Sequence, residues 1–264
     1  MTGIIDRVYR SVSRPLSDHW LGGLHTGLVI KGLYLQWQVA DFLRSGSRRV
    51  LDVGCGPKVQ MAAMLARRYP SSVFMGMDLH LELEARDRAF LPVNLSVVEA
   101  DVTQVQKHEV FDLVYSVDVL EHIDDIEGVL DRLVAALRPG GRLVLHTPSL
   151  DERRWLAVSP AGDGARFRAH RSGDDHVHEG FSLAQLTDAL TRRSIIVLDA
   201  RPTFGRWVSL VKELFSWGES RGVKGIGLLL LPVALAGVLM EMVMAPQRGN
   251  GSMVVGKKPE SIAA

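Results

Sequence analysis

The sequence is poor in the residues that several kinds of site require. It has one cysteine, Cys55, in 264 residues, which excludes an intrachain disulfide and an iron–sulfur cluster held by several thiolates. The formal net charge is only +1, and basic and aromatic residues do not alternate along the chain. Composition therefore predicts no nucleic-acid partner. A single thiol also fits a reducing compartment, and we expect a cytoplasmic protein.

Long apolar runs are nearly absent as well. The first 20 residues lack the apolar centre of a signal peptide. Residues 225–240 carry no charge, but this run of 16 residues is short of the ~20 that a spanning helix needs. Pro232 lies in its middle. We interpret residues 223–245 as an apolar helix that meets a membrane surface or a lipidic acceptor, or that packs into the domain or a dimer interface.

An alternation of strands and helices runs through most of the chain. Short β-branched runs, such as "RRVLDV" and "FDLVYSV", alternate with helical runs, such as "LELEARDRAF" at residues 81–90. The clearest helix is expected over residues 124–137, where Ile126, Val129 and Leu133 recur at spacings of three and four. Such alternation predicts a parallel sheet covered on both faces, with ligands at the carboxyl ends of the strands.

The stretch "VLDVGCGPK" at residues 50–58 predicts a close backbone approach to a ligand. An apolar strand ends at Asp52, and Gly54 and Gly56 follow. Glycine admits an approach that a side chain would block, and the N-terminus of the next helix favours an anionic group. A purely structural turn between strand and helix fits the glycines equally well.

Acidic residues at successive strand ends favour the ligand interpretation. Asp78 ends the second expected strand and Asp101 the third. The Asp78 carboxylate could accept hydrogen bonds from both hydroxyls of a ribose. The Asp101 carboxylate could accept one from the exocyclic amine of an adenine. The fourth strand runs into "FDLVYSVDVLEHIDD", a dense cluster of acids with one histidine.

The chain resembles a class I S-adenosylmethionine-dependent methyltransferase of the small-molecule type with an "LEH" signature. The matching stretches are "VLDVGCGPK", "VFMGMDL", "VVEADVT", "FDLVYSVDVLEHIDD" and "LRPGGRLVLHTPS", which span residues 50–149. The resemblance implies a Rossmann-like α/β fold with a seven-stranded, mostly parallel sheet. Its last strand is antiparallel and inserted between strands five and six.

The resemblance also implies S-adenosyl-L-methionine as cofactor and a small molecule as methyl acceptor. The cofactor residues that it implies are Asp52, Gly54, Cys55, Gly56, Asp78, Leu79, Asp101, Val102, Ser116 and Val117. Asp52 and the glycines would line the methionine part, Asp78 would hold the ribose, and Leu79 would pack on the adenine. Asp101 and Val102 would meet the adenine edge, with Ser116 and Val117 under the sulfonium.

Histidines are the candidates for the general base. Methyl transfer needs a nucleophile held in line that loses its proton, and histidine titrates in the required range. His146 follows the fifth strand and is expected to point into the cleft. His176 and His178, in "DDHVHEG", lie where the acceptor would be covered. Each also fits a structural role. The crowded "HVH" stretch is not predicted to bind a metal, and His122 of "LEH" is expected to be structural.

Three other functions remain compatible with parts of the sequence. A protein of this fold can bind the cofactor without catalysis, or transfer another group from the sulfonium. A nicotinamide-dependent oxidoreductase would share the glycine loop, but Val59 stands where its fingerprint requires Gly or Ala. Lys58 stands where many methyltransferases have a third glycine, which narrows the loop or places a cation near the cofactor carboxylate.

We expect residues 1–264 to form one domain. Its expected parts are an N-terminal helical cap at 1–47, a cofactor-binding core at 48–147, an acceptor-side loop region at 148–181, a helix and sixth strand at 182–203, an apolar helical insertion at 204–246, and a last strand and tail at 247–264. The oligomeric state does not follow from the sequence.

Overall fold

A computed structural model describes residues 26–105, 108–150, 177–221 and 226–260. The centre of the molecule is a seven-stranded sheet of order β3-β2-β1-β4-β5-β7-β6. The strands are β1 (Arg49–Val53), β2 (Val73–Asp78), β3 (Leu95–Glu99), β4 (Phe111–Val117), β5 (Leu137–Pro148), β6 (Ile196–Thr203) and β7 (Gly251–Lys257). Strands β1 to β5 pair in parallel, whereas β7 pairs antiparallel with β5 and β6. The predicted sheet is therefore confirmed, including its inserted last strand.

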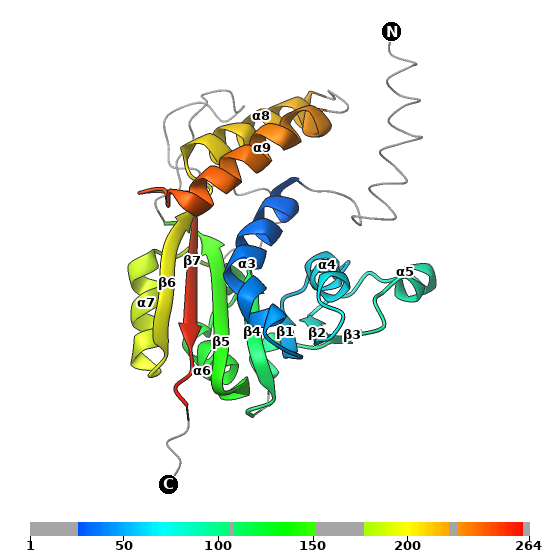
Figure 1. Ribbon diagram of the computed structural model, residues 1–264, viewed down its shortest axis with the longest axis vertical. Coiled ribbons are helices and arrows are strands. Elements are labelled where there is room, and N and C mark those ends of the chain that lie inside the picture. Colours follow the sequence, from blue (N-terminus) through cyan, green and yellow to red (C-terminus); the bar gives the residue numbers. More distant parts are fainter. Residues whose placement is uncertain (1–25, 106–107, 151–176, 222–225, 261–264) are drawn as a thin grey trace.

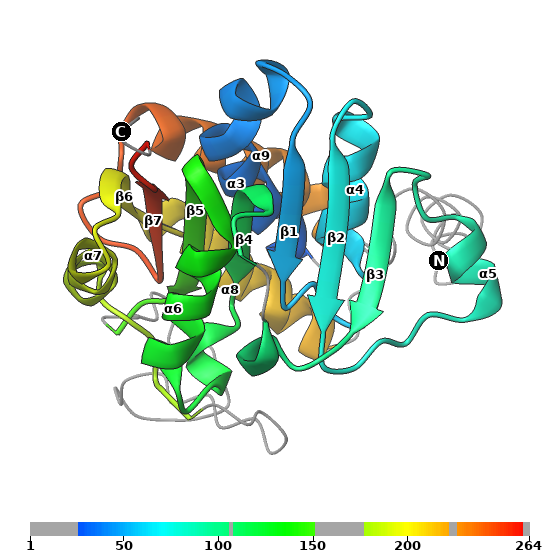
Figure 2. The same cartoon turned by 90° about the horizontal axis from the view of Figure 1, so that it is seen from below.

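Helices cover both faces of this sheet (Figures 1 and 2). One layer contains α3 (Thr26–Arg44) and α4 (Gln60–Arg68), and the other contains α6 (Ile126–Ala136) and α7 (Leu183–Arg192). Helices α8 (Arg206–Ser220) and α9 (Ile226–Val243) lie beyond β6 and β7 (Figure 1), where α9 packs on α3 and extends the apolar cluster of the first layer. Each layer buries its own apolar cluster against the sheet. The first includes Leu35 and Val238, and the second includes Leu133 and Leu190.

Two segments differ from the sequence expectation at their ends. The helix expected over "LELEARDRAF" is reduced to α5 (Ala85–Ala89). Residues 81–84 form a loop, in which the Leu81 N–H donates to the Glu99 carboxylate at 2.8 Å and the Glu82 N–H to the Pro57 carbonyl at 2.9 Å. Helix α6 ends before "RPGG", because Leu137 is already extended and pairs with Phe111 as the first residue of β5.

Helices α8 and α9 form a hairpin in the region expected to be an apolar helical insertion, and Pro232 lies inside α9. The hairpin is joined to α3 by a buried hydrogen-bonded cluster. The Tyr34 hydroxyl donates to the Glu241 carboxylate, which also accepts from the Gly205 N–H at 3.0 Å. Burial raises the pKa of Glu241. Because an unpaired buried carboxyl is costly, these bonds fix α9 against α3. Within the described residues, no helix is long and apolar enough to cross a bilayer.

Candidate active site

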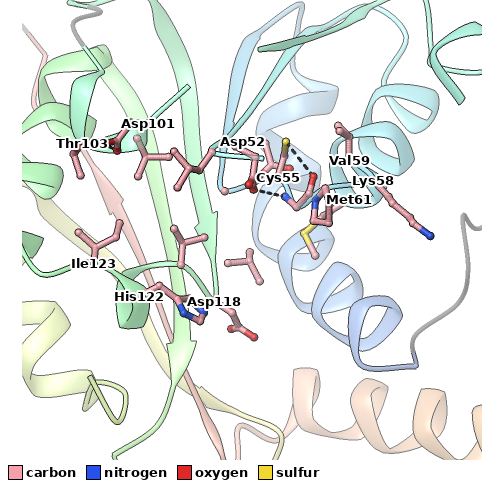
Figure 3. A pocket seen from close by; sticks show the side chains of 18 of the residues that line it. Asp52, Cys55, Lys58, Val59, Met61, Asp101, Thr103, Asp118, His122 and Ile123 are labelled. Atoms are coloured by element: carbon pink, nitrogen blue, oxygen red, sulfur yellow. Dashed lines mark hydrogen bonds between the residues drawn. The ribbon is translucent and has the colours of Figure 1, made fainter. Parts of the chain in front are cut away.

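A cavity of about 1160 Å³ opens at the carboxyl ends of β1, β2 and β4 (Figure 3). Its walls are the glycine loop after β1, the residues that follow β2 and β3, and the segment from Val117 to Asp125. Leu28 and Lys31 of α3 line another part. The cavity is where parallel α/β sheets hold their ligands, because the strand ends and helix N-termini converge there.

The glycine loop is held against β2 by backbone bonds. The N–H groups of Gly54 and Cys55 donate to the Met77 carbonyl at 2.8 and 3.0 Å. Gly54 has φ +72°, and a Cβ there would lie 2.1 Å from Val119 Cγ2. Gly56 has φ +75°, but no atom lies within 4 Å of its Cβ position. Gly54 is therefore required by packing, while Gly56 leaves its backbone open to a ligand.

The acids that end the strands have different environments. Asp52 is buried, and this burial raises its pKa to about 7 although the Tyr115 hydroxyl donates to it at 2.8 Å. Asp78 Oδ2 accepts from the Gly56 N–H at 2.7 Å, so this carboxylate also supports the loop. Asp101 accepts from the Thr103 N–H at 2.8 Å, and hydrogen bonding by the Thr103 side chain, followed by this backbone contact, lowers the pKa of Asp101. Both Asp78 and Asp101 line the cavity.

A charged cluster lies at the far side of the cavity, after β4. Asp118 pairs with Lys31 of α3, and its Oδ1 lies 2.7 Å from His146 Nδ1. His146 Nε2 lies 2.9 Å from Thr203 Oγ1. Burial opposes ionisation of Asp118, but Lys31 and His146 outweigh it and hold the pKa of Asp118 below its usual range. In Figure 3, Asp118 and His122 lie across the cavity from Met61.

Asp118 was not singled out by the sequence interpretation. Asp118 could have been identified from its position directly after an apolar strand, within the acidic cluster of "FDLVYSVDVLEHIDD". Its neighbour Glu121 is buried, and this burial together with the charge of Asp118 raises the pKa of Glu121 to about 8. Asp118 thus remains the ionised acid of the two at neutral pH.

The structure brings together all but one of the residues predicted to contact the cofactor. Ser116 is the exception, because its side chain is buried within β4 and does not line the cavity. Val117, the next residue, lines the cavity, and so does Leu79, which is 70% exposed. Their roles toward the cofactor stay predictions.

Of the predicted histidines, His146 lies elsewhere than expected. His146 does not point into the cavity: it is 2% exposed and lies behind Asp118, packed near Phe204. The reason is the alternation of side chains along β5, which directs it toward Thr203. His178 Nε2 lies 3.1 Å from the Ile123 carbonyl and does not line the cavity. His176 lies outside the described residues. His122, in the short helix η3 (Leu120–His122), does line the cavity.

Comparison with known proteins agrees with this geometry. The family described as "Methyltransferase domain" matches residues 34–193. A trans-aconitate 2-methyltransferase of Pseudomonas aeruginosa is 30% identical over 136 residues, which cover 47% of this chain and 49% of that protein. The chain thus spans about half the length of the curated relatives it matches.

Solved structures share the fold at low identity. Phosphoethanolamine N-methyltransferase 2 of Haemonchus contortus, in complex with S-adenosyl-L-methionine, matches with a TM-score of 0.59 and 18% identity over 98% of this chain and 60% of that one. The cyclase SpnF matches with a TM-score of 0.55 and 18% identity over 85% and 81% of the two chains. The family match, the sheet order and the cavity together show that this chain belongs to the class I S-adenosylmethionine-dependent methyltransferases.

Proposed function

We propose that this protein transfers a methyl group from S-adenosylmethionine to a small acceptor that binds beside Asp118. The observation that carries the proposal is the division of one cavity into two ends. The glycine loop, Asp78 and Asp101 form one end, and the Lys31–Asp118 pair forms the other. A cofactor and an acceptor can therefore lie in contact, which is the main requirement for group transfer.

The residues of the first end fit the cofactor. The open space at Gly56 accommodates a ligand against the loop backbone. Asp78 keeps lone pairs for ribose hydroxyls beyond its bond to the loop, and Asp101 stands at the adenine position. Lys58 lines the same cavity, where a cation suits a carboxylate. When bound, S-adenosylmethionine supplies an electrophilic methyl group on a sulfonium.

At the second end, Asp118 orients the acceptor. Its carboxylate is ionised, and its side chain is 24% exposed. It accepts a hydrogen bond from an acceptor N–H or O–H and so aims the lone pair of that atom. With its pKa lowered, Asp118 is a weak base, and its contribution is orientation. His146 is a positioning residue, because it holds Asp118 from behind and touches no cavity space.

The acceptor is proposed to be uncharged or apolar. Curated relatives carry names that specify trans-aconitate, which is a polycarboxylate. In this chain the cation nearest to the acceptor end, Lys31, is already paired with Asp118, and Leu28 and Val119 add apolar wall. Among the described residues that line the cavity, Arg132 pairs with Asp125 and Lys58 belongs to the glycine loop. Within this part of the chain, a polycarboxylate would therefore meet Asp118 without an unpaired cation beside it.

Titration calorimetry and a product screen test this function. The full chain is titrated with S-adenosylmethionine and separately with NAD⁺, and then incubated with S-adenosylmethionine and candidate acceptors. Binding of the former and the mass gain of one methyl on an acceptor support the proposal. Binding with no product from any acceptor favours a non-catalytic protein, and another mass gain indicates another transferred group. Response to NAD⁺ alone would favour an oxidoreductase.

A further inference from the structure

Helix α9 has an exposed apolar face that nothing in the described structure covers. Apolar residues surround the whole helix, yet only one side of it is buried. Ala234 and Val238 pack in the core at 0% exposure. On the opposite side, six side chains are 39% to 79% exposed: Leu229, Val233, Leu239, Met240, Val243 and the following Met244. They recur at spacings of one, three, four and six and lie on one side of a 3.6-residue helix. We call these six residues the α9 face.

Helix α8 beside it also exposes apolar side chains. Trp207 is 59% exposed, and Leu214, two turns later on the same side of α8, is 38% exposed. Single exposed apolar residues are common on proteins, but a contiguous patch of this kind marks an interaction surface. Figure 1 shows α8 and α9 packed side by side at one end of the molecule, beyond β6 and β7. The hairpin therefore presents its outer side chains at an end of the protein.

The hairpin that carries the α9 face has more cations than acids: residues 206–248 contain five Lys and Arg residues and three Glu residues, two of which, Glu213 and Glu219, are in α8. Residues 226–248 contain one acid, Glu241, and it is buried against Tyr34. Exposed arginines stand at both ends, Arg221 before α9 and Arg248 after it. The Arg221 guanidinium lies 4.7 Å from the centre of the Trp217 ring. An apolar helix face with arginine and tryptophan at its borders is the pattern of a helix lying in the interface of an anionic bilayer.

We propose that the α9 face docks on a membrane that contains anionic lipids, with α9 parallel to the membrane plane. The apolar side chains enter the acyl boundary, while Arg221 and Arg248 meet headgroup phosphates. The opposite side of α9 packs on α3, whose Leu28 and Lys31 line the cavity. Docking would therefore bring the acceptor end close to the bilayer. If the proposed methyl transfer holds, an apolar acceptor can pass from the lipid to Asp118.

A second copy of the chain is a less favourable partner for the α9 face than an anionic membrane is. In a two-fold contact each α9 meets its own copy, so arginines of one copy meet arginines of the other at the borders. No exposed acid between residues 226 and 248 balances them. Like charges at the edge of a desolvated interface oppose association, whereas headgroup phosphates neutralise the same arginines.

Sedimentation with lipid vesicles tests the docking. The full chain is mixed with vesicles of phosphatidylcholine alone or of phosphatidylcholine with about 30% phosphatidylglycerol. The anionic lipid gives the second kind of vesicle a negative surface potential. We expect binding to the anionic vesicles, at least tenfold weaker in the double variant Leu229→Ser/Val243→Ser. The matched control Phe90→Ser/Val93→Ser removes exposed apolar residues near α5 and should bind like the wild type. Arg221→Gln/Arg248→Gln should lose the preference for anionic vesicles.

Other outcomes overturn the docking. One is that the protein sediments with neither kind of vesicle. Another is that Leu229→Ser/Val243→Ser and the control Phe90→Ser/Val93→Ser lose vesicle binding equally. A dimer in sedimentation velocity that Leu229→Ser/Val243→Ser dissociates would assign the α9 face to a second copy. S-adenosylmethionine affinity, measured without lipid on every variant, shows that each one is folded. It also separates failure of docking from failure of the proposed function, because none of the three pairs of substitutions touches the cavity.

Discussion

Asp118 Oδ1 lies 2.7 Å from His146 Nδ1, while Lys31 pairs with the same carboxylate from α3. The histidine is buried and the acid reaches the cavity. This contact places the histidine behind the acid, so that the acid alone can meet an acceptor. Two partners on one carboxylate also fix its direction, which is what an orienting group needs.

Asp118→Asn should lower kcat/KM for the methylated acceptor by roughly 10- to 100-fold, the equivalent of losing a hydrogen bond to a charged group of about 1.5–3 kcal/mol. S-adenosylmethionine affinity should stay near the wild-type value. His146→Gln retains a polar partner for Asp118 and should cost less than His146→Ala. Steady-state kinetics and calorimetry on the same samples measure both quantities. Full kcat/KM in the Asp118→Asn protein would remove this residue from the acceptor site.

Asp78→Ala should weaken S-adenosylmethionine binding by roughly 1.5–3 kcal/mol, because two ribose hydrogen bonds to a carboxylate are lost. Asp78 also bonds the Gly56 N–H, so some stability is lost as well. Asp87→Ala serves as control, since Asp87 bonds the Glu84 N–H at the start of α5, away from the cavity. It should change stability without changing calorimetric affinity. An unchanged affinity in folded Asp78→Ala would refute the ribose role.

Gly54→Ala should destabilise the fold more than Gly56→Ala. Both positions have positive φ, which costs an alanine about 1–2 kcal/mol, but only the methyl group at Gly54 meets Val119. Urea unfolding measures the difference. Adding Val119→Ala should restore part of the stability of Gly54→Ala and none of that of Gly56→Ala. Equal costs at the two glycines would show that the loop shifts to admit the methyl group.

The contribution of Asp52 to the free energy of unfolding should fall as pH rises from about 4 to 7. Its pKa is raised from 3.8 to about 7 in the folded protein by burial. Between these values the folded protein keeps the proton that the unfolded chain releases, so rising pH favours unfolding. Asp52→Asn should remove this part of the slope. Tyr115→Phe deletes the bond that lowers the pKa, so the slope should extend to higher pH.

Denaturant unfolding at a series of pH values measures these slopes. The relevant quantity is the difference between wild type and Asp52→Asn, because other groups titrate equally in both proteins. A difference that is constant from pH 4 to 8 would contradict a raised pKa at Asp52.

The α/β fold and the convergence of three strand-end acids at one edge of the sheet follow from local sequence features. Strand periodicity, the order of elements and the glycine loop are local features, and parallel strands bring their carboxyl ends to one edge. Asp52, Asp78 and Asp101 therefore lie at that edge whatever the packing of the helices. The helix expected at residues 81–90 begins only at Ala85, where Glu84 and Asp87 form a capping box. The preceding N–H groups of Leu81 and Glu82 donate to partners distant in sequence, the Glu99 carboxylate and the Pro57 carbonyl.

The Lys31–Asp118 pair at the cavity and the exposed α9 face depend on contacts between distant segments of the chain. Lys31 and Asp118 are 87 residues apart, and Tyr34 and Glu241 are 207 apart, so no local pattern joins them. His146 was expected in the cleft, but the pleat of β5 directs it behind Asp118. Because apolar residues surround α9, its sequence has no period that marks a buried side. The bonds to α3 choose that side, and they leave the α9 face exposed.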